Sequence, residues 1–405
     1  MSHHDFLVGT FNTPQLYTLR FTPPSSHSQP GSLTIVHRAK AIGSHSWLHL
    51  NPPRKDGTRT LYATAWTDPP SVVAYKVHSP TQIDLLGSAE TKSRSGYVCA
   101  SEKAVYSAGG ATGEVFSIDP ESGNFTSPSS KSQSTTSTTA IPPLQNLSFI
   151  DAQVQRDDGS TMDFGGLRHG AHSADLSPDN KALYIADIGR NCIWTYSVSP
   201  DDGTLTLGEK HISPRPNDGP RHVHPHPTCQ YVYSLQEHTS IVDVFATSNA
   251  GVNLTHVQGV RIIPDDEHEK DYWADEVRTS LSDGDKPRYL YASTRGLTPG
   301  KKGFVAVYKL RDDGTVDTLA TSPYSDSGSN NELYAGLLYM YETPTSGGWA
   351  NAIQPGPTTN GVEYLALTDS EKGYVFVLSW DGWQIKEVAR TRLDEGAGAA
   401  TAVWL

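Results

Sequence analysis

Residues 219–245, GPRHVHPHPTCQYVYSLQEHTSIVDVF, place two strand patterns beside a cluster of charged and imidazole side chains. Apolar residues alternate over 231–235 and 241–245, and turn residues bound both runs, which is typical of half-buried strands. The proline-rich segment before them is expected to be a loop that carries Arg221 and three histidines. Arg221 therefore precedes a strand and Glu237 follows it, where both side chains can face an opening.

The phrase at 232–234 recurs along the whole chain as an apolar residue, an aromatic or small residue, and another apolar or small residue. Each copy is followed by a second strand pattern, and most of these patterns end in a turn with Asp, Pro or Gly. The copies begin at Leu61, Val105, Leu183, Val232, Leu290 and Leu365, and the second patterns cover 72–77, 115–118, 193–198, 241–245, 304–310 and 374–380.

A seventh unit is split between the two ends of the sequence. Strand patterns cover 6–11 and 16–21 at the start, and another covers 399–405 at the end. Seven such units without a convincing amphipathic helix predict an all-β fold, a seven-bladed β-propeller of four-stranded antiparallel blades. Pairing of the N- and C-terminal strands would close the ring. A pair of β-sandwiches or a β-helix is the alternative.

Composition limits the classes of partner. The net charge is −12, which argues against nucleic acid, and no apolar run is long enough to span a membrane. The start of the chain shows no signal-peptide pattern, and Cys99, Cys192 and Cys229 have no paired spacing, so we expect a cytoplasmic protein with reduced thiols. We expect one domain over 1–405, with the Ser/Thr-rich insertion at 126–139 disordered. A homo-oligomer is possible.

Five residues near successive strand ends could converge on one mouth of the channel. Arginine binds carboxylates with two parallel hydrogen bonds, and histidine or glutamate can transfer protons. The alternative to a functional site is a set of structural ion pairs that join neighbouring blades. The five residues are His172, Arg221, Glu237, Glu276 and Arg295.

A metal site is the weaker interpretation of the histidines. His222, His224 and His226 alternate, so a strand would point them to one face. The prolines at 220, 225 and 227 favour a loop instead. We therefore expect neither a metal nor an organic cofactor.

Three stretches, 172–196, 219–245 and 274–296, resemble the lactonase family of seven-bladed propellers, and within it the fungal carboxy-cis,cis-muconate cyclases. The resemblance implies a metal-independent, lactone-forming enzyme of aromatic catabolism, in the protocatechuate branch. It also implies a site in which His172, Arg221, Glu237 and Arg295 are catalytic. Two departures concern substrate identity: Trp349 stands where the family would have a histidine, and the 323–348 loop is longer.

The resemblance implies a substrate with several carboxylates, one of which adds across a C=C bond to close the lactone. Arg221 and Arg295 would hold the other carboxylates, with His222 and Glu276 as further substrate-binding residues. Either His172 or Glu237 would supply the proton. The alternatives are a lactone hydrolase of the 6-phosphogluconolactonase type and a propeller that binds without catalysis.

Overall fold

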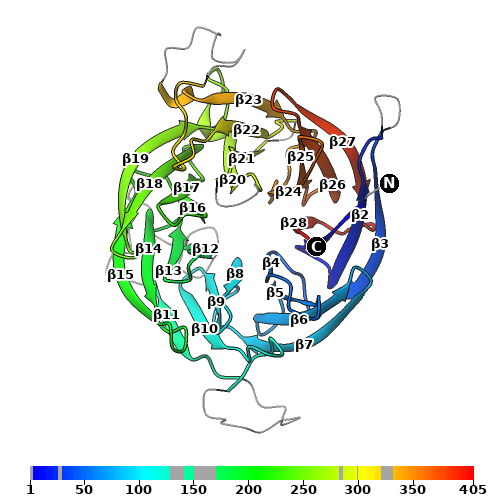
Figure 1. Cartoon of the computed structure of the whole chain (residues 1–405), viewed down its shortest axis with the longest axis vertical. Helices are drawn as coiled ribbons and strands as arrows, with labels where there is room; N and C mark the ends of the chain where they lie inside the picture. Colours follow the sequence, from blue (N-terminus) through cyan, green and yellow to red (C-terminus); the bar gives the residue numbers. More distant parts are fainter. Residues whose placement is uncertain are drawn as a thin grey trace.

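Seven four-stranded antiparallel sheets stand as blades around a central axis, so the predicted seven-bladed β-propeller is confirmed (Figure 1). The computed structural model describes residues 3–25, 30–127, 141–149, 170–281, 286–298, 300–320 and 332–405. Most of the insertion at 126–139 and part of the 323–348 loop lie outside these ranges. Within them there is no α-helix, only the short 3-10 turns η2 (Glu269–Asp271) and η3 (Glu332–Tyr334).

The inner strand of each blade lines the axis, and the functional site is built on these strands. Each inner strand pairs with one neighbour only, so its other edge faces the channel. They are β4 (Leu48–Leu50), β8 (Tyr97–Ala100), β12 (Ala171–Leu176), β16 (Pro220–Pro225), β20 (Tyr272–Thr279), β24 (Ile353–Thr359) and β28 (Ala399–Trp404).

The second and third strands of the blades contain the recurring sequence phrases. Both faces of these strands are covered by the neighbouring blades, which explains their nearly continuous apolar runs. The second strands are β1 (His4–Thr10), β5 (Arg59–Ala65), β9 (Ala104–Gly109), β13 (Ala182–Asp187), β17 (Tyr231–Gln236), β21 (Tyr289–Gly296) and β25 (Val362–Thr368). The third strands are β2 (Gln15–Thr22), β6 (Ser71–Ser79), β10 (Thr112–Ser117), β14 (Cys192–Val198), β18 (Ile241–Ser248), β22 (Phe304–Lys309) and β26 (Tyr374–Trp380).

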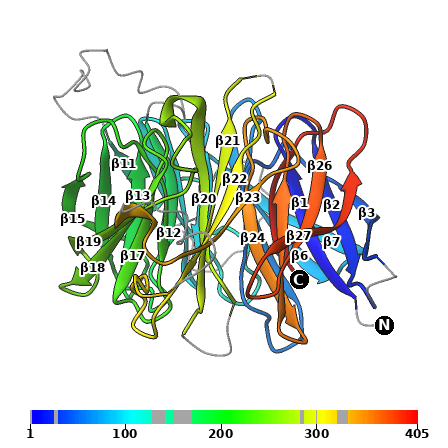
Figure 2. The same ribbon diagram turned by 90° about the horizontal axis from the view of Figure 1, so that it is seen from above.

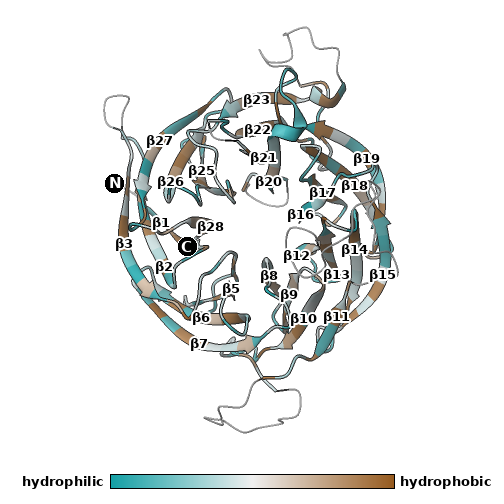
Figure 3. Cartoon of the chain, turned by 180° about the vertical axis from the view of Figure 1, so that it is seen from behind, coloured by the Kyte–Doolittle hydropathy of each residue, from teal (hydrophilic) through white to brown (hydrophobic). Residues whose placement is uncertain are grey.

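The outer strands form the wall of the disc, which Figure 2 shows from the side. Most of their residues are exposed or half-buried, and Figure 3 shows hydrophilic and hydrophobic segments along them. They are β3 (Ser32–Lys40), β7 (Gln82–Glu90), β11 (Gln145–Ser148), β15 (Leu205–Ile212), β19 (Asn253–Arg261), β23 (Leu337–Glu342) and β27 (Ile385–Arg392).

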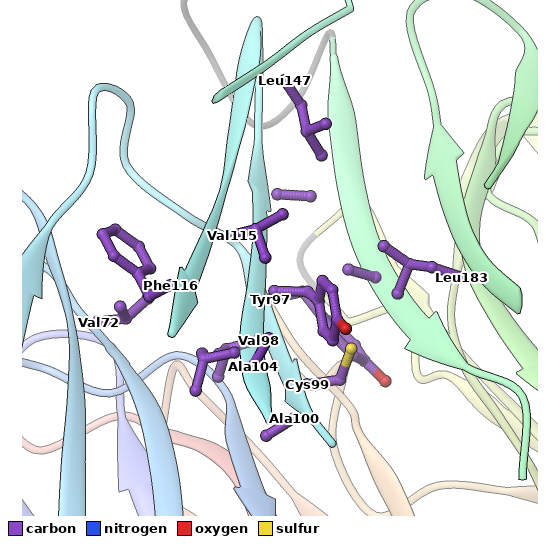
Figure 4. Packing of buried hydrophobic residues seen from close by; sticks show 14 of the residues in the cluster. Val72, Tyr97, Val98, Cys99, Ala100, Ala104, Val115, Phe116, Leu147 and Leu183 are labelled. Carbon is purple, nitrogen blue, oxygen red and sulfur yellow. The ribbon is translucent and has the colours of Figure 1, made fainter. Parts of the chain in front are cut away.

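The core fills the spaces between blades. Figure 4 shows one such region, where Val72 of β6 faces Phe116 of β10, and Tyr97 and Cys99 of β8 approach Leu183 of β13. The buried strand pairs therefore hold each blade to the next through apolar contacts, which are the main favourable contribution to folding. Cys99, Cys192 and Cys229 form no disulfide.

A tyrosine in the second strand ties each of four blades to the turn of the following blade. Tyr106 donates a hydrogen bond to the carbonyl of Gly203 at 3.0 Å, and Tyr184 does the same to Gly251 at 2.8 Å. Both glycines have positive φ, and a Cβ there would lie within 3 Å of the tyrosine oxygen. The recurring aromatic position is therefore part of the contact between blades. Tyr62 and Tyr233 bond Gly123 and Gly314 in the same way.

The ring closes as predicted from the split seventh unit. β28 pairs with β1, in the order β28-β1-β2-β3, and the ring centroids of Phe6 and Trp404 lie 4.5 Å apart. No helix of the described residues is long and apolar enough to cross a membrane.

Candidate active site

A cavity of about 350 Å³ opens at one mouth of the channel, a size suited to a small-molecule ligand. The N-terminal parts of β12, β16 and β20 form one side of it. Glu237, which follows β17, and Arg295, near the end of β21, also line it. All six residues proposed from the sequence line this cavity. They are His172, Arg221, His222, Glu237, Glu276 and Arg295.

Three successive inner strands are irregular at the positions that face the cavity. The pairing register shifts at His172 in β12, at Arg221 in β16 and at Asp275 in β20. A β-bulge leaves one residue unpaired and re-aims its side chain. The shift therefore lets two consecutive residues face the cavity, Arg221 with His222 and Asp275 with Glu276, where a regular strand would turn one of them away.

The structure corrects the expected loop before residue 231. Pro220–Pro225 is the inner strand β16, so Arg221 lies within a strand rather than before one. Proline lacks a backbone N–H and is tolerated where a strand edge has no partner. That condition holds here, because β16 pairs only with β17.

Arg221 is the centre of a buried ion-pair cluster. Its Nε lies 2.9 Å from Oε2 of Glu237, and its Nη2 lies 2.9 Å from Oδ1 of Asp275. Its Nη1 also donates to the backbone carbonyl of Asp275. These contacts fix the plane of the guanidinium at the floor of the cavity.

Arg295 approaches the same two carboxylates from β21, but at longer range. It lies 4.0 Å from Glu237 and 4.0 Å from Asp275, and it donates to the carbonyl of Trp349 at 2.6 Å. Its guanidinium also stacks over the ring of Trp273, 4.8 Å from the centroid. Arg295 is therefore held less tightly by acidic groups than Arg221.

The surroundings of Glu237 favour its ionised form. Burial opposes its ionisation, but the contact with His238 and the charges of Arg221 and Arg295 together lower its pKa to about 2. Asp275 behaves differently: burial raises its pKa above the ordinary value, and Arg221 and Arg295 oppose that shift.

His172 faces the cavity as a neutral imidazole. Burial, with smaller contributions from Arg221 and His222, holds its pKa well below the ordinary value. Its Nδ1 is buried and finds no hydrogen-bond partner in the described part of the chain. Its ring lies 5.3 Å from that of His222. A neutral imidazole can donate one hydrogen bond and accept another.

His222 and Glu276 form a second acid–base pair beside the arginine cluster. His222 Nδ1 lies 3.0 Å from Oε1 of Glu276, and Arg278 Nη2 lies 3.1 Å from the same oxygen. Burial raises the pKa of Glu276 to about 7, although Arg278 and Arg221 oppose the shift. Glu276 is therefore partly protonated at neutral pH.

The alternating histidines have separate partners. His222 contacts Glu276, His224 contacts Thr279 at 3.1 Å, and His226 contacts Thr228 at 2.8 Å. Among the described residues no group of three or more His, Cys, Asp or Glu side chains could hold a metal ion.

Aromatic side chains form the rim of the cavity. Phe11 lies 5.5 Å from Trp66 and 6.3 Å from Trp349, measured between ring centroids. Trp349, the departure noted in the sequence, is 68% exposed at this rim, and its carbonyl holds Arg295. A bound molecule could therefore contact apolar rings at the rim and charged side chains deeper in the cavity.

Sequence reasoning missed Asp275 and Trp273. Both lie in the segment that supplied Glu276, so the signal was present in the residue types. Strict alternation would point Asp275 away from Glu276, and only the register shift brings both to the cavity.

Comparison with known proteins relates the chain to lactonases and muconate-converting enzymes. The family model described as Lactonase, 7-bladed beta-propeller, matches residues 5–327. Muconate cycloisomerase 1 of Cutaneotrichosporon cutaneum is 39% identical over 415 residues, covering 99% of this chain and 98% of that protein. Carboxy-cis,cis-muconate cyclase of Neurospora crassa is 28% identical over 247 residues, covering 58% of this chain and 60% of that protein.

A solved structure shares the architecture. The periplasmic gluconolactonase PpgL of Pseudomonas aeruginosa superposes with a TM-score of 0.73 at 15% identity, over 100% of this chain and 99% of that chain. At this identity the likeness concerns the fold alone.

Proposed function

This chain belongs to the lactonase family of seven-bladed β-propellers, and from that premise we propose that it is a lactone-forming cycloisomerase acting on a muconate-type polycarboxylate. The observation that carries the proposal is the convergence of His172, Arg221 and Asp275, each at a strand irregularity, with Glu237 and Arg295 in one small cavity. The cavity thus combines arginines that can bind carboxylates with histidine and acidic side chains that can take part in proton transfer.

The reaction is an intramolecular addition. One carboxylate oxygen of the substrate attacks a carbon of the conjugated diene and forms the C–O bond of the lactone. The π electrons move toward another carboxylate, which becomes an enediolate until its α-carbon takes up a proton. Negative charge therefore grows on oxygens that a cation can hold.

Arg221 and Arg295 are the groups proposed to hold that charge. Glu237 and Asp275 already orient Arg221, so its remaining donors are preorganised rather than recruited during the reaction. Arg295, with its longer ion-pair distances, can turn toward a substrate carboxylate at lower cost. Glu237 serves as the common anchor of both arginines.

We propose that the proton comes from neither of the two groups considered from the sequence, His172 and Glu237. Glu237, with a pKa of about 2, has no proton to give near neutral pH. His172 is neutral there, because its pKa lies well below the ordinary value, and a neutral imidazole is a poor acid. We propose that His172 instead donates a hydrogen bond to a substrate oxygen.

The test uses pure protein with three substrates in parallel: cis,cis-muconate, 3-carboxy-cis,cis-muconate and 6-phosphogluconolactone. Lactone formation removes the conjugated diene, so ultraviolet absorbance should fall with either muconate. Acid release from the phosphogluconolactone alone would contradict the cycloisomerase and favour a lactone hydrolase. Absence of any reaction would favour a binding protein. The two muconates together show whether the third carboxylate is required.

A further inference from the structure

Glu276 lies between the candidate active site and a second cavity. The second cavity, of about 270 Å³, is lined by the C-terminal ends of the same inner strands, with Asp175 of β12, His224 of β16 and Arg278 of β20. The first cavity takes its residues from the N-terminal ends of those strands. The two cavities therefore occupy opposite ends of the channel, and Trp47 belongs to the walls of both.

A chain of polar side chains connects the two cavities. Arg278 Nη2 lies 3.1 Å from Glu276 Oε1 and donates to the hydroxyl of Tyr97 at 2.7 Å. Tyr97 in turn donates to Oδ1 of Asp175 at 3.0 Å. Because Tyr97 and Glu276 contact the same guanidinium nitrogen, one water molecule could bridge their oxygens.

The two carboxyl groups at the ends of this chain have matched acidities. Burial raises the pKa of Asp175 to about 7, as it does for Glu276, and Arg278 opposes both shifts. A proton can pass between groups of similar pKa at little net cost in free energy. The charged and titratable groups that face Glu276 are His222 and Arg221 from β16, Arg278 and Asp275 from β20, Tyr97 from β8 and Asp175 from β12.

The proposed reaction consumes a proton in each turnover, so the site needs a path by which protons can be resupplied. Each turnover forms one C–O bond and one C–H bond and breaks one C=C π bond, so the product leaves with one proton that the substrate did not bring. Phe11, Trp66, Trp349 and Glu276 all line the first cavity, so a substrate that fills it would separate Glu276 from the solvent at that mouth. The returning proton is best supplied from the other end of the channel.

Resting on the proposed function, we propose that Glu276 delivers the proton to the α-carbon and that Asp175, in the second cavity, returns a proton to it. The electron pair of the enediolate forms the C–H bond with the proton of Glu276, which becomes a carboxylate. The Tyr97 hydroxyl then turns from Asp175 toward a bridging water and gives its proton through that water to Glu276, while the Tyr97 oxygen takes up the proton of Asp175. Solvent water in the second cavity reprotonates Asp175.

The first variant is Glu276→Gln, which keeps the shape and removes the acid. We expect kcat with muconate to fall at least a hundredfold while KM changes less than about threefold, because a positioned acid contributes roughly 10²–10⁴ in rate. Wild-type kcat should fall as pH rises through about 7, and the variant should lose that limb. The matched control is Glu363→Gln, a buried carboxylate 2.9 Å from Arg288 in another part of the ring, which should leave kcat unchanged.

The second variant is Asp175→Asn, measured by rapid mixing at pH 6, where Glu276 starts protonated. The first turnover should proceed within about twofold of the wild-type rate, and the steady-state rate should fall at least tenfold. Equal slowing of both phases, or of neither, would overturn the role of Asp175. A Glu276→Gln variant with near wild-type kcat would overturn the role of Glu276. Wild-type protein that forms no lactone from either muconate would instead refute the proposed function.

Discussion

Glu237→Gln tests the claim that one buried carboxylate anchors both arginines. The pKa of Glu237 is about 2 against an ordinary value of 4.5, which corresponds to about 3 kcal/mol of unfolding free energy. Because the pKa is lowered in the folded state, this stabilisation is fully present above pH 4.5 and is lost as the pH falls toward 2. The amide also releases Arg221 and Arg295, so kcat/KM should fall at least tenfold.

Urea unfolding of wild type and variant at pH 7, 5, 4 and 3 measures the predicted effect. The difference in unfolding free energy should be about 3 kcal/mol at pH 7 and should shrink between pH 4.5 and 3. Any packing defect caused by the amide is independent of pH and cancels in this comparison. A difference that stays constant from pH 7 to 3 would refute the idea that Glu237 is held ionised by its neighbours.

Three further predictions concern the arginine clamp, metal and the contacts between blades. Arg221→Lys should lower kcat/KM at least tenfold, because an ammonium group cannot contact Glu237 and Asp275 with the geometry of a guanidinium. An unchanged kcat/KM at an unchanged melting temperature would contradict the proposed role of Arg221 in holding a substrate carboxylate. Dialysis against a strong chelator should leave the rate with muconate unchanged, and recovery of a lost rate by one divalent ion would contradict this. Tyr106→Phe should lower the unfolding free energy by about 1 kcal/mol without changing turnover, since it removes only the hydrogen bond to Gly203; denaturant titration and the ultraviolet assay measure the two effects.

The middle strands of the blades were the most predictable part of the fold. Phrases such as that at 183–185 mark strands buried on both faces, whose apolar runs end at turn residues. The inner strands were harder to identify, as β16 shows. Its terminal prolines favour a loop in isolation, and only the position at the channel edge makes them compatible with a strand.

The site was predictable by residue type and not by register. The family resemblance and the positions near strand ends selected His172, Arg221, Glu237 and Arg295, and these residues line one cavity. Asp275 was missed because a register shift leaves no trace in the alternation of the sequence. The low pKa of Glu237 was also beyond prediction, since it depends on the contact with His238 and on the distances to two arginines from different blades.

The closure of the ring by β28 has a consequence for the synthesis of the chain. β1, β2 and β3 leave the ribosome long before their inner partner β28, which follows them by almost the whole length of this sequence. Until it arrives, the edge of β1 is unpaired, and an unpaired edge can recruit strands from other chains. The nascent first blade is therefore the part most exposed to misassembly, and chaperone binding during translation should concentrate on it.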